Sequence, residues 1–390
     1  APKNTIRRYI VLGMIILINL FLVQEVQASH IVGGDLTYKH ISGDSFELNL
    51  RIYRDKESST PFDSTVYFFI YDEDINGEIN LFETRSVFLP NPVGIDMVPF
   101  IDPCVESPPD VEFGYLVYKD TLVLPNTGYL NSYHVASHRC CRNCALSNVM
   151  DPDNTGIVWY VEVLKEALDV QYSSPTFDLF PEYYICLEAD SEIDFSVTSS
   201  TAGSEIHYYP YTPFAAGADE SCLIQYVAND TCEANNETYI INEEMLPPYD
   251  PIIWQNANEE KQFNLTSEFE VDLNSGIVTV NPTGEGLFLV GIEAVEINPD
   301  TRDTLSIVRK EFEIKVVMCN KTIADFEIPS SICGFTDITF SNYSILGNSF
   351  EFYPDTTLFP GVVIITNDVN TVFQYDYVDP GVYNPLLIAF

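Results

Sequence analysis

Apolar and polar residues alternate with a period of two along several short runs of this chain. In residues 46–54, Phe46, Leu48, Leu50 and Ile52 are separated by polar residues, as expected of a strand with one buried face. Further strands are predicted at residues 31–38, 65–71, 82–89, 114–124, 156–164, 193–197, 205–209, 269–272, 275–280, 286–294 and 306–317. Amphipathic helical spacing is not sustained anywhere. The pattern therefore predicts an all-β chain of tandem β-sandwich modules.

The chain is too long for one sandwich, so it is divided where extended or turn-rich segments interrupt the strands. We predict a cysteine-containing sandwich at residues 29–187, a second sandwich at 188–320 and a third β domain at 321–390. The third domain could be truncated, because the sequence stops inside a strand-like run.

The N-terminus has the features of a secretory signal peptide. Lys3, Arg7 and Arg8 precede the apolar run 9–23, and a small-residue cleavage pattern ends at Ala28. We predict that residues 1–28 are removed, leaving an exported protein on the outer cell surface or outside the cell. The alternative is an uncleaved anchor helix. No second run is long enough to span a membrane, so no membrane partner is expected after cleavage.

The formal net charge is −40, from 58 acidic and 18 basic residues. This balance argues against nucleic acid and against an anionic membrane as partners. The charge fits either solubility alone or carboxylates that bind Ca²⁺. Pairs of acidic residues on the predicted strands are interpreted as solvated faces.

Export places the cysteines in an oxidising compartment, where disulfides are expected. The candidates are Cys104, Cys140, Cys141, Cys144, Cys186, Cys222, Cys232, Cys319 and Cys333. Nine is an odd number, so at least one thiol is left over or pairs outside the chain. Cys222 with Cys232 would be a sequence-local pair, and Cys319 with Cys333 would bridge the boundary near residue 320, but the sequence leaves the connectivity open.

Three of these cysteines lie in residues 134–148, a segment that we expect to tie distant parts of its domain together. Two other interpretations of this segment remain open. His134 and His138 with the Cys141-x-x-Cys144 spacing could hold zinc, although four-residue histidine spacing needs a helix. Cys140 or Cys141 could also act as a nucleophile with a histidine, although no oxyanion loop accompanies them.

One acidic segment matches the spacing of a calcium loop. The predicted ligands are the side chains of Asp72, Asp74, Asn76 and Glu83 and the carbonyl of Glu78, around a turn at Gly77. Both flanks are predicted strands, so the competing interpretation is an acidic hairpin with an Asn-Gly turn. No cofactor is firmly predicted, and calcium is the candidate that this spacing favours.

No nucleophile elbow, zinc-protease motif, phosphate loop or dinucleotide fingerprint occurs in the sequence. We therefore predict that the protein is not an enzyme and has no catalytic residues.

Several sequence blocks resemble the large exported surface proteins of gliding Bacteroidota, which carry PKD domains and a gliding-motility-associated C-terminal region. The blocks are residues 29–38 with Tyr53-Arg54-Asp55, the Arg-Cys-Cys-Arg-Asn block 139–143, residues 173–177, and Ile185-Cys186. Residues 275–282 resemble the cadherin-like module of these proteins. Residues 324–326, 340–344 and 379–383 resemble a PKD domain.

The chain also departs from the family at three places. Lys56 stands where the family usually has cysteine, and Cys144 where it usually has another residue. The PKD signature is degraded at residues 350–355. The family's disulfide scheme therefore cannot be transferred unchanged.

The resemblance implies immunoglobulin-, cadherin- and PKD-like sandwiches, type IX secretion, and a non-enzymatic cell-surface adhesin or structural protein linked to gliding motility. Its partner would be an extracellular polysaccharide or protein. Two alternatives stay open: accessory modules of an exported hydrolase, and a carbohydrate-binding surface module.

Overall fold

The alternation seen in the sequence becomes a buried and a solvent-facing side of each strand. In the computed structural model, strand β2 (Ser45–Asp55) has Phe46, Leu48, Leu50 and Ile52 buried on one face. The structure describes residues 31–55, 62–90, 94–97, 113–139, 142–152, 155–177, 184–199, 201–216, 246–319, 324–327, 337–344, 347–368, 370–379 and 381–389. The predicted signal peptide and Cys104, Cys140, Cys141, Cys222, Cys232 and Cys333 lie outside these residues.

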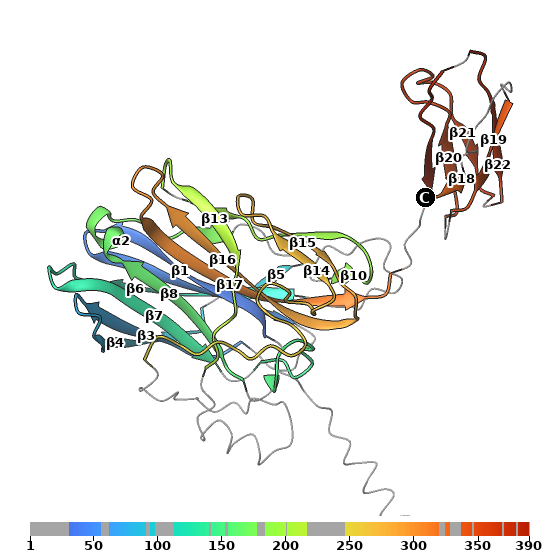
Figure 1. Cartoon of the computed structure of the whole chain (residues 1–390). Helices are drawn as coiled ribbons and strands as arrows, with labels where there is room; N and C mark the ends of the chain where they lie inside the picture. Colours follow the sequence, from blue (N-terminus) through green and yellow to red (C-terminus); the bar gives the residue numbers. More distant parts are fainter. Residues whose placement is uncertain are drawn as a thin grey trace, which may run out of the picture. The chain divides into compact units, whose positions relative to one another are not determined.

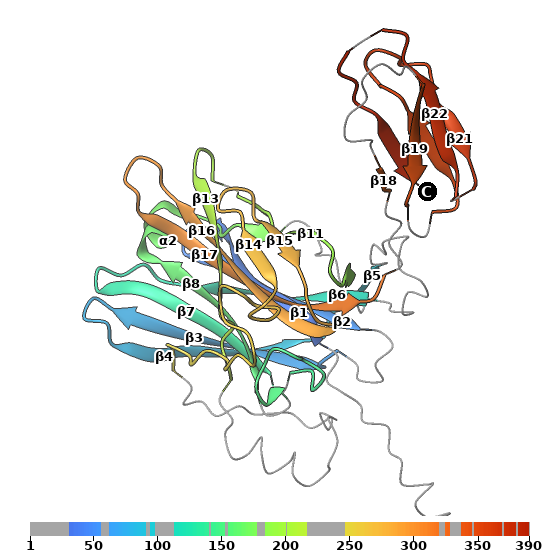
Figure 2. The ribbon, with the colours of Figure 1, turned by 45° about the vertical axis from the view of Figure 1, so that its right-hand side comes forward.

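A large antiparallel sheet runs through most of the N-terminal part of the chain (Figure 1). Its order is β13 (Glu205–Pro210), β16 (Gly286–Ile297), β17 (Thr304–Val317), β1 (Ile31–Ser42), β2, β6 (Phe113–Val123) and β5 (Ile95–Met97), and β10 (Tyr184–Cys186) also pairs with β17. The seam is the pairing of β1 with β17, in which Gly33 lies opposite Phe312 and Asp35 opposite Lys310. Figure 2 also shows these two strands side by side.

A four-stranded sheet covers one face of β1, β2 and β6. Its order is β4 (Ile79–Phe88), β3 (Thr65–Asp74), β7 (Leu130–Arg139) and β8 (Ile157–Leu164), and the short helix α2 (Lys165–Val170) follows β8. Phe46, Leu48 and Tyr118 from the large sheet share one buried cluster with Phe68 and Trp159 from the four-stranded sheet. These two layers form a β-sandwich. Strand β7 was not predicted, because its sequence was assigned to the cysteine-rich segment.

A three-stranded sheet lies near β16 of the large sheet. It consists of β11 (Ser191–Asp194), β15 (Ile277–Asn281) and β14 (Glu268–Val271). The Phe263 ring lies 6.1 Å from Phe269 of β14 and 5.3 Å from Phe288 of β16. A further two-stranded ribbon joins β9 (Thr176–Phe177) to β12 (Val197–Thr198).

This arrangement corrects the predicted boundary between residues 187 and 188. The described residues between 31 and 316 belong to one unit, because β1 of the first predicted module pairs directly with β17 of the second. The two predicted modules therefore share one sheet. The all-β class is confirmed, whereas the separate sandwich at 188–320 is not found.

Two glycines permit close packing at the seam. A Cβ atom on Gly33 would lie 2.3 Å from the carbonyl oxygen of Glu311 on β17. A Cβ atom on Gly34 would lie 2.4 Å from Nε1 of Trp159, in the opposing sheet. Glycine is needed at both positions because β17 and the four-stranded sheet each approach the β1 backbone closely there.

The C-terminal described residues form a second unit that begins at residue 317. One sheet contains β18 (Phe326–Glu327), β19 (Asp337–Asn342) and β22 (Val372–Asp376), and the other β21 (Ile364–Thr366), β20 (Phe350–Tyr353) and β23 (Leu386–Ala389). Phe340, Phe350, Phe352 and Phe373 are buried in its core. This unit starts close to the predicted third domain.

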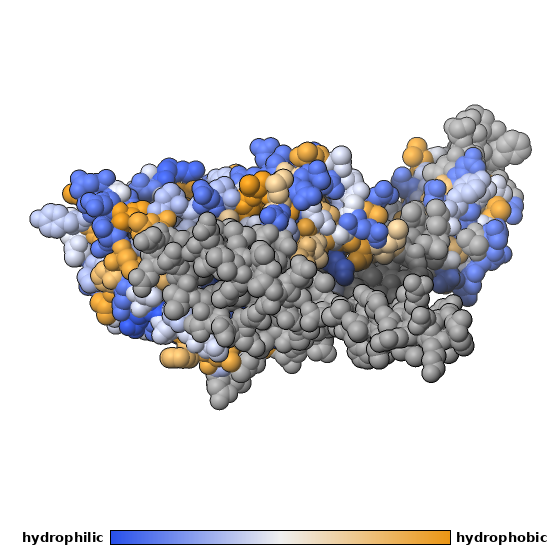
Figure 3. Space-filling model, turned by 90° about the horizontal axis from the view of Figure 1, so that it is seen from below, coloured by the Kyte–Doolittle hydropathy of each residue, from blue (hydrophilic) through white to orange (hydrophobic). Residues whose placement is uncertain are grey.

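Figure 3 shows the molecule from below, with hydrophilic and hydrophobic residues interspersed on the coloured surface. Mixed composition of this kind is ordinary for a protein surface. Among the residues that the structure describes, none of the helices has both the length and the apolar character needed to cross a membrane.

Candidate functional site

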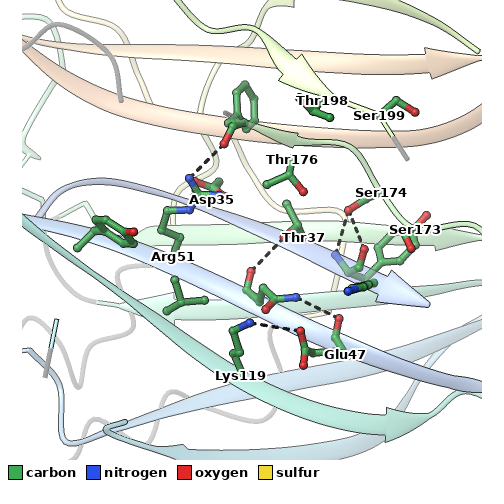
Figure 4. A pocket seen from close by; sticks show the side chains of 16 residues that line it. Asp35, Thr37, Glu47, Arg51, Lys119, Ser173, Ser174, Thr176, Thr198 and Ser199 are labelled. Atoms are coloured by element: carbon green, nitrogen blue, oxygen red, sulfur yellow. Dashed lines mark hydrogen bonds and ion pairs between the residues drawn. The ribbon is translucent and has the colours of Figure 1, made fainter. Parts of the chain in front are cut away.

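A polar pocket of about 620 Å³ lies on the face of the large sheet that is opposite the sandwich core. Because side chains alternate along a strand, the core-facing residues of β2 are interleaved with Glu47, Asn49 and Arg51, which line the pocket. β1 and β6 supply the rest of the floor, and residues 173–177 and 198–199 form the rim (Figure 4).

Hydrogen bonds hold the rim residues 173–177 against β1 and β2. The Ser174 hydroxyl accepts a bond from the Tyr38 amide at 3.0 Å and donates one to the Tyr38 carbonyl at 3.1 Å. Ser173 accepts a bond from the His40 amide at 3.0 Å. Arg51 Nη1 donates to the Phe177 carbonyl at 3.1 Å. The pocket is therefore preformed, with its rim fixed to a sheet.

Basic residues gather in this pocket although the chain as a whole is strongly acidic. Lys39, Arg51 and Lys119 line it together with the carboxylates of Asp35 and Glu47. Lys119 Nζ lies 3.4 Å from Glu47 Oε1, and Arg51 Nε lies 3.6 Å from Asp35 Oδ2. Lys39 is exposed and has no carboxylate partner among the described residues. The pocket thus keeps one cation available to a ligand.

The bottom of the pocket is a buried charged cluster. Asp35 is 1 % exposed, and neither of its carboxylate oxygens has a hydrogen-bond partner among the described residues. The Nζ atom of the fully buried Lys310 lies 3.8 Å from Asp35 and 3.1 Å from the Tyr53 hydroxyl. Burial lowers the pKa of Lys310 to about 8, while Asp35 acts to raise it.

Hydroxyl groups complete the lining. Thr37, Ser173, Thr176, Thr198 and Ser199 line the pocket, and Figure 4 shows them on both sides of it. Together with the Asn49 amide and the Tyr115 ring, this lining can bind a ligand that is itself rich in hydroxyls. The lysines and Arg51 can bind a negative group on that ligand.

The predicted calcium loop is a hairpin in the structure. Asp74 Oδ1 accepts bonds from the amides of Asn76 at 2.8 Å and Glu78 at 2.9 Å, and these bonds lower the pKa of Asp74. Glu83 lies opposite Ile70, back along β4, and its carboxylate accepts a bond from Arg85 at 3.1 Å. The five predicted ligands are therefore not gathered around one point, and Asp72 lies opposite Asn80 in the strand ladder.

The Arg-Cys-Cys-Arg-Asn block ties distant segments together through its polar side chains. Arg139 Nε lies 2.7 Å from Asp63, and Arg142 Nη2 lies 2.9 Å from Glu311 on β17. Asn143 Nδ2 donates to Glu313 at 3.2 Å. Acidic residues on β17 are therefore buried rather than solvated, which corrects the general expectation for acids on strands. Burial raises the pKa of Glu311, and it raises the pKa of Glu313 well above its ordinary value.

The described cysteines differ in state. Cys186 and Cys319 are disulfide-bonded, whereas Cys144 retains its thiol. Cys144 is also the position at which the chain departs from the resembled family.

The two histidines of the zinc interpretation lie on one strand and not on a helix. On β7, four residues span about 13 Å, so His134 and His138 cannot share one ion. His138 Nε2 lies 3.3 Å from the Tyr249 hydroxyl, and burial lowers the pKa of His138 to about 4. His134 instead lies near Glu73 and Glu162, and ligand atoms of these three residues are all within 4.8 Å of one another.

Sequence reasoning missed both the pocket and the Glu73–His134–Glu162 group. Neither contains a continuous motif, because each draws single residues from several strands. No protein family model matches the chain, and no curated protein matches it.

Proposed function

We propose that this protein is an exported, non-enzymatic surface protein that binds a saccharide bearing carboxylate groups, as an adhesin or structural component. The polar pocket on the large sheet is the binding site in this proposal. The observation that carries it is the gathering of Lys39, Arg51 and Lys119 in one hydroxyl-lined pocket of a chain with net charge −40.

The chemistry of the pocket supports an acidic saccharide over a neutral one. Serine, threonine and asparagine side chains match sugar hydroxyls as donors and acceptors. Lys39 and Lys119 can contact a carboxylate at the open side, while Arg51 is already held by Asp35 and the Phe177 carbonyl. At physiological ionic strength, screening over about 8 Å limits repulsion by the remote acidic residues.

The two-unit architecture supports a role at a surface. The second unit has its own core, so it can act as a spacer or a further attachment module. We propose that it is a PKD-like sandwich and that the first unit derives from immunoglobulin- or cadherin-like elements. We also propose export to the outer surface, in accord with the disulfide-bonded state of Cys186 and Cys319.

Calorimetric titration of the mature chain with oligogalacturonate tests the proposal. We expect saturable binding that falls at least fivefold in a Lys39→Ala, Lys119→Ala double variant. The matched control is a Lys165→Ala, Lys261→Ala double variant, which removes one partly exposed and one exposed lysine outside the pocket and should bind as the wild type does.

Titration with a neutral oligosaccharide of the same length distinguishes a requirement for carboxylates from saccharide binding in general. Equal affinity for both sugars would refute the requirement for a carboxylate. Absence of binding to either sugar, or equal loss in the control variant, would refute the pocket as a saccharide site.

A further inference from the structure

We propose that Glu73, His134 and Glu162 form a binding site for a Zn²⁺ ion on the four-stranded sheet. The three residues come from adjacent strands: His134 of β7 lies directly opposite Glu162 of β8, and Glu73 of β3 lies opposite Ser132, two residues from His134. Directly opposed and diagonal residues on one face of a sheet bring their side chains within reach of each other. The strand register therefore brings the three side chains close to one another.

The separations suit a small ion. Zinc bonds of about 2.0–2.2 Å place tetrahedral ligand atoms about 3.3 Å from one another. Glu73 Oε2 lies 3.1 Å from His134 Nε2, and the ligand atoms of all three residues lie within 4.8 Å of one another. Zinc binding at this site requires Glu162 to approach the other two ligands by a side-chain rotation, and water would supply the fourth ligand.

Neighbouring groups orient the imidazole in the way that metal sites require. His134 is 6 % exposed, and its Nδ1 atom lies 2.5 Å from the Tyr160 hydroxyl. A proton on Nδ1 donated to Tyr160 would leave the Nε2 lone pair facing Glu73. The Ser132 hydroxyl donates to the same Glu73 oxygen at 2.9 Å. A second-shell partner on the far imidazole nitrogen is a usual feature of metal-binding histidines.

The local charge also favours a cation. Glu162 has neither a hydrogen bond nor an ion pair with any residue that the structure describes, so two carboxylates face one imidazole without an arginine or lysine partner. The imidazole selects zinc or a similar transition ion over Ca²⁺, which prefers oxygen ligands. The competing account is a purely structural network in which Tyr160 donates to Nδ1 and Nε2–H donates to Glu73.

Calorimetry with ZnCl₂ on the oxidised mature chain, after dialysis against EDTA, tests the site. We expect one zinc ion per chain, with affinity at least tenfold weaker in Glu162→Gln and lost in His134→Gln. Tyr160→Phe should weaken binding about 10–100-fold, as second-shell changes do. Thermal unfolding in EDTA checks that each variant is folded, and Glu162→Gln, at a half-exposed position, preserves the buried residues.

Two controls locate the ion. Glu83→Gln changes a glutamate on the same sheet and should bind zinc as the wild type does. Cys144→Ser should also leave binding unchanged, and the spectrum of the Co²⁺ complex should lack thiolate charge-transfer bands. Undiminished zinc binding in both Glu162→Gln and His134→Gln, or no stoichiometric binding in the wild type, would overturn the proposal.

Discussion

Lys310 on β17 and Asp35 on β1 face each other at the seam of the large sheet, with Nζ 3.8 Å from Oδ2 and both side chains at most 1 % exposed. A charge that is removed from water is costly unless an opposite charge compensates it. The pair therefore links Asp35, at the floor of the pocket, to β17, the strand that pairs with β1. The Lys310 ammonium also lies 4.6 Å from the centre of the Tyr53 ring, which further stabilises the cation.

Replacing Lys310 with methionine should destabilise the first unit by about 3 kcal/mol, because Asp35 would be buried without its lysine partner. Arg51 at 3.6 Å keeps the loss from being larger. Adding Asp35→Asn should recover part of the stability, since it removes the stranded charge. Urea unfolding of the wild type, the two single variants and the double variant measures this coupling. If the double variant were less stable than Lys310→Met alone by the full cost of Asp35→Asn, the two residues would be energetically independent.

Arg142→Met should lower the free energy of unfolding by about 3 kcal/mol, because it leaves Glu311 buried and unpaired. Arg302→Met is the matched control: Arg302 also forms a 2.9 Å ion pair, with Glu205, but its side chain is 61 % exposed. That exposed pair should contribute no more than about 1 kcal/mol. Denaturant unfolding compares the two variants. Equal effects would show that Arg142 is not holding a buried charge.

The strand prediction succeeded where burial on one face repeats along a short run. Residues 46–54 and 156–164 correspond to β2 and β8. The same information could not predict that β1 pairs with β17, because strand partners that are far apart in sequence leave no local pattern. β17 also misled the charge analysis. Its Glu311 and Glu313 look like a solvated face until Arg142 and Asn143 arrive from another segment.

The titration of Glu313 should make stability depend on pH. Burial raises the pKa of this carboxyl well above its ordinary value of 4.5. The folded protein thus binds a proton that the unfolded chain has already released. The stability due to the protonated form is fully present below pH 4.5 and is lost as pH rises through the folded pKa. Glu313→Gln should remove this contribution, so the variant should gain stability relative to wild type as pH rises. If the free energies of unfolding of the two proteins changed in parallel with pH, the raised pKa of Glu313 would be contradicted.

The Asp72–Glu83 segment matches the ligand spacing of a calcium loop but folds as a hairpin. The spacing matches a calcium loop that runs between helices, but here two strands keep Glu83 beside Ile70. By contrast, Glu73, His134 and Glu162 have no sequence spacing in common, and only the register of three strands reveals them. The pocket lining was equally invisible, because Lys39, Arg51 and Lys119 come from three strands.

Asp74→Ala tests the hairpin directly. Asp74 accepts three bonds within its own turn, from the amides of Asn76 and Glu78 and from the Asn76 side chain. Their loss should lower the thermal midpoint by no more than a few degrees, and calcium should not change that difference. Differential scanning calorimetry with calcium or EDTA makes the comparison. A stabilisation by calcium in the wild type that Asp74→Ala abolishes would instead support the calcium loop.

The described residues between 31 and 316 form one unit, and the sheet that they share positions the pocket. The most direct test of this shared unit is urea unfolding of fragments 29–187 and 29–319, monitored by near-ultraviolet circular dichroism. We predict a single cooperative transition for 29–319. For 29–187 we predict no cooperative transition, because β1 lacks β17 and Asp35 lacks Lys310. A cooperative transition and a native-like aromatic spectrum for 29–187 alone would contradict the shared sheet.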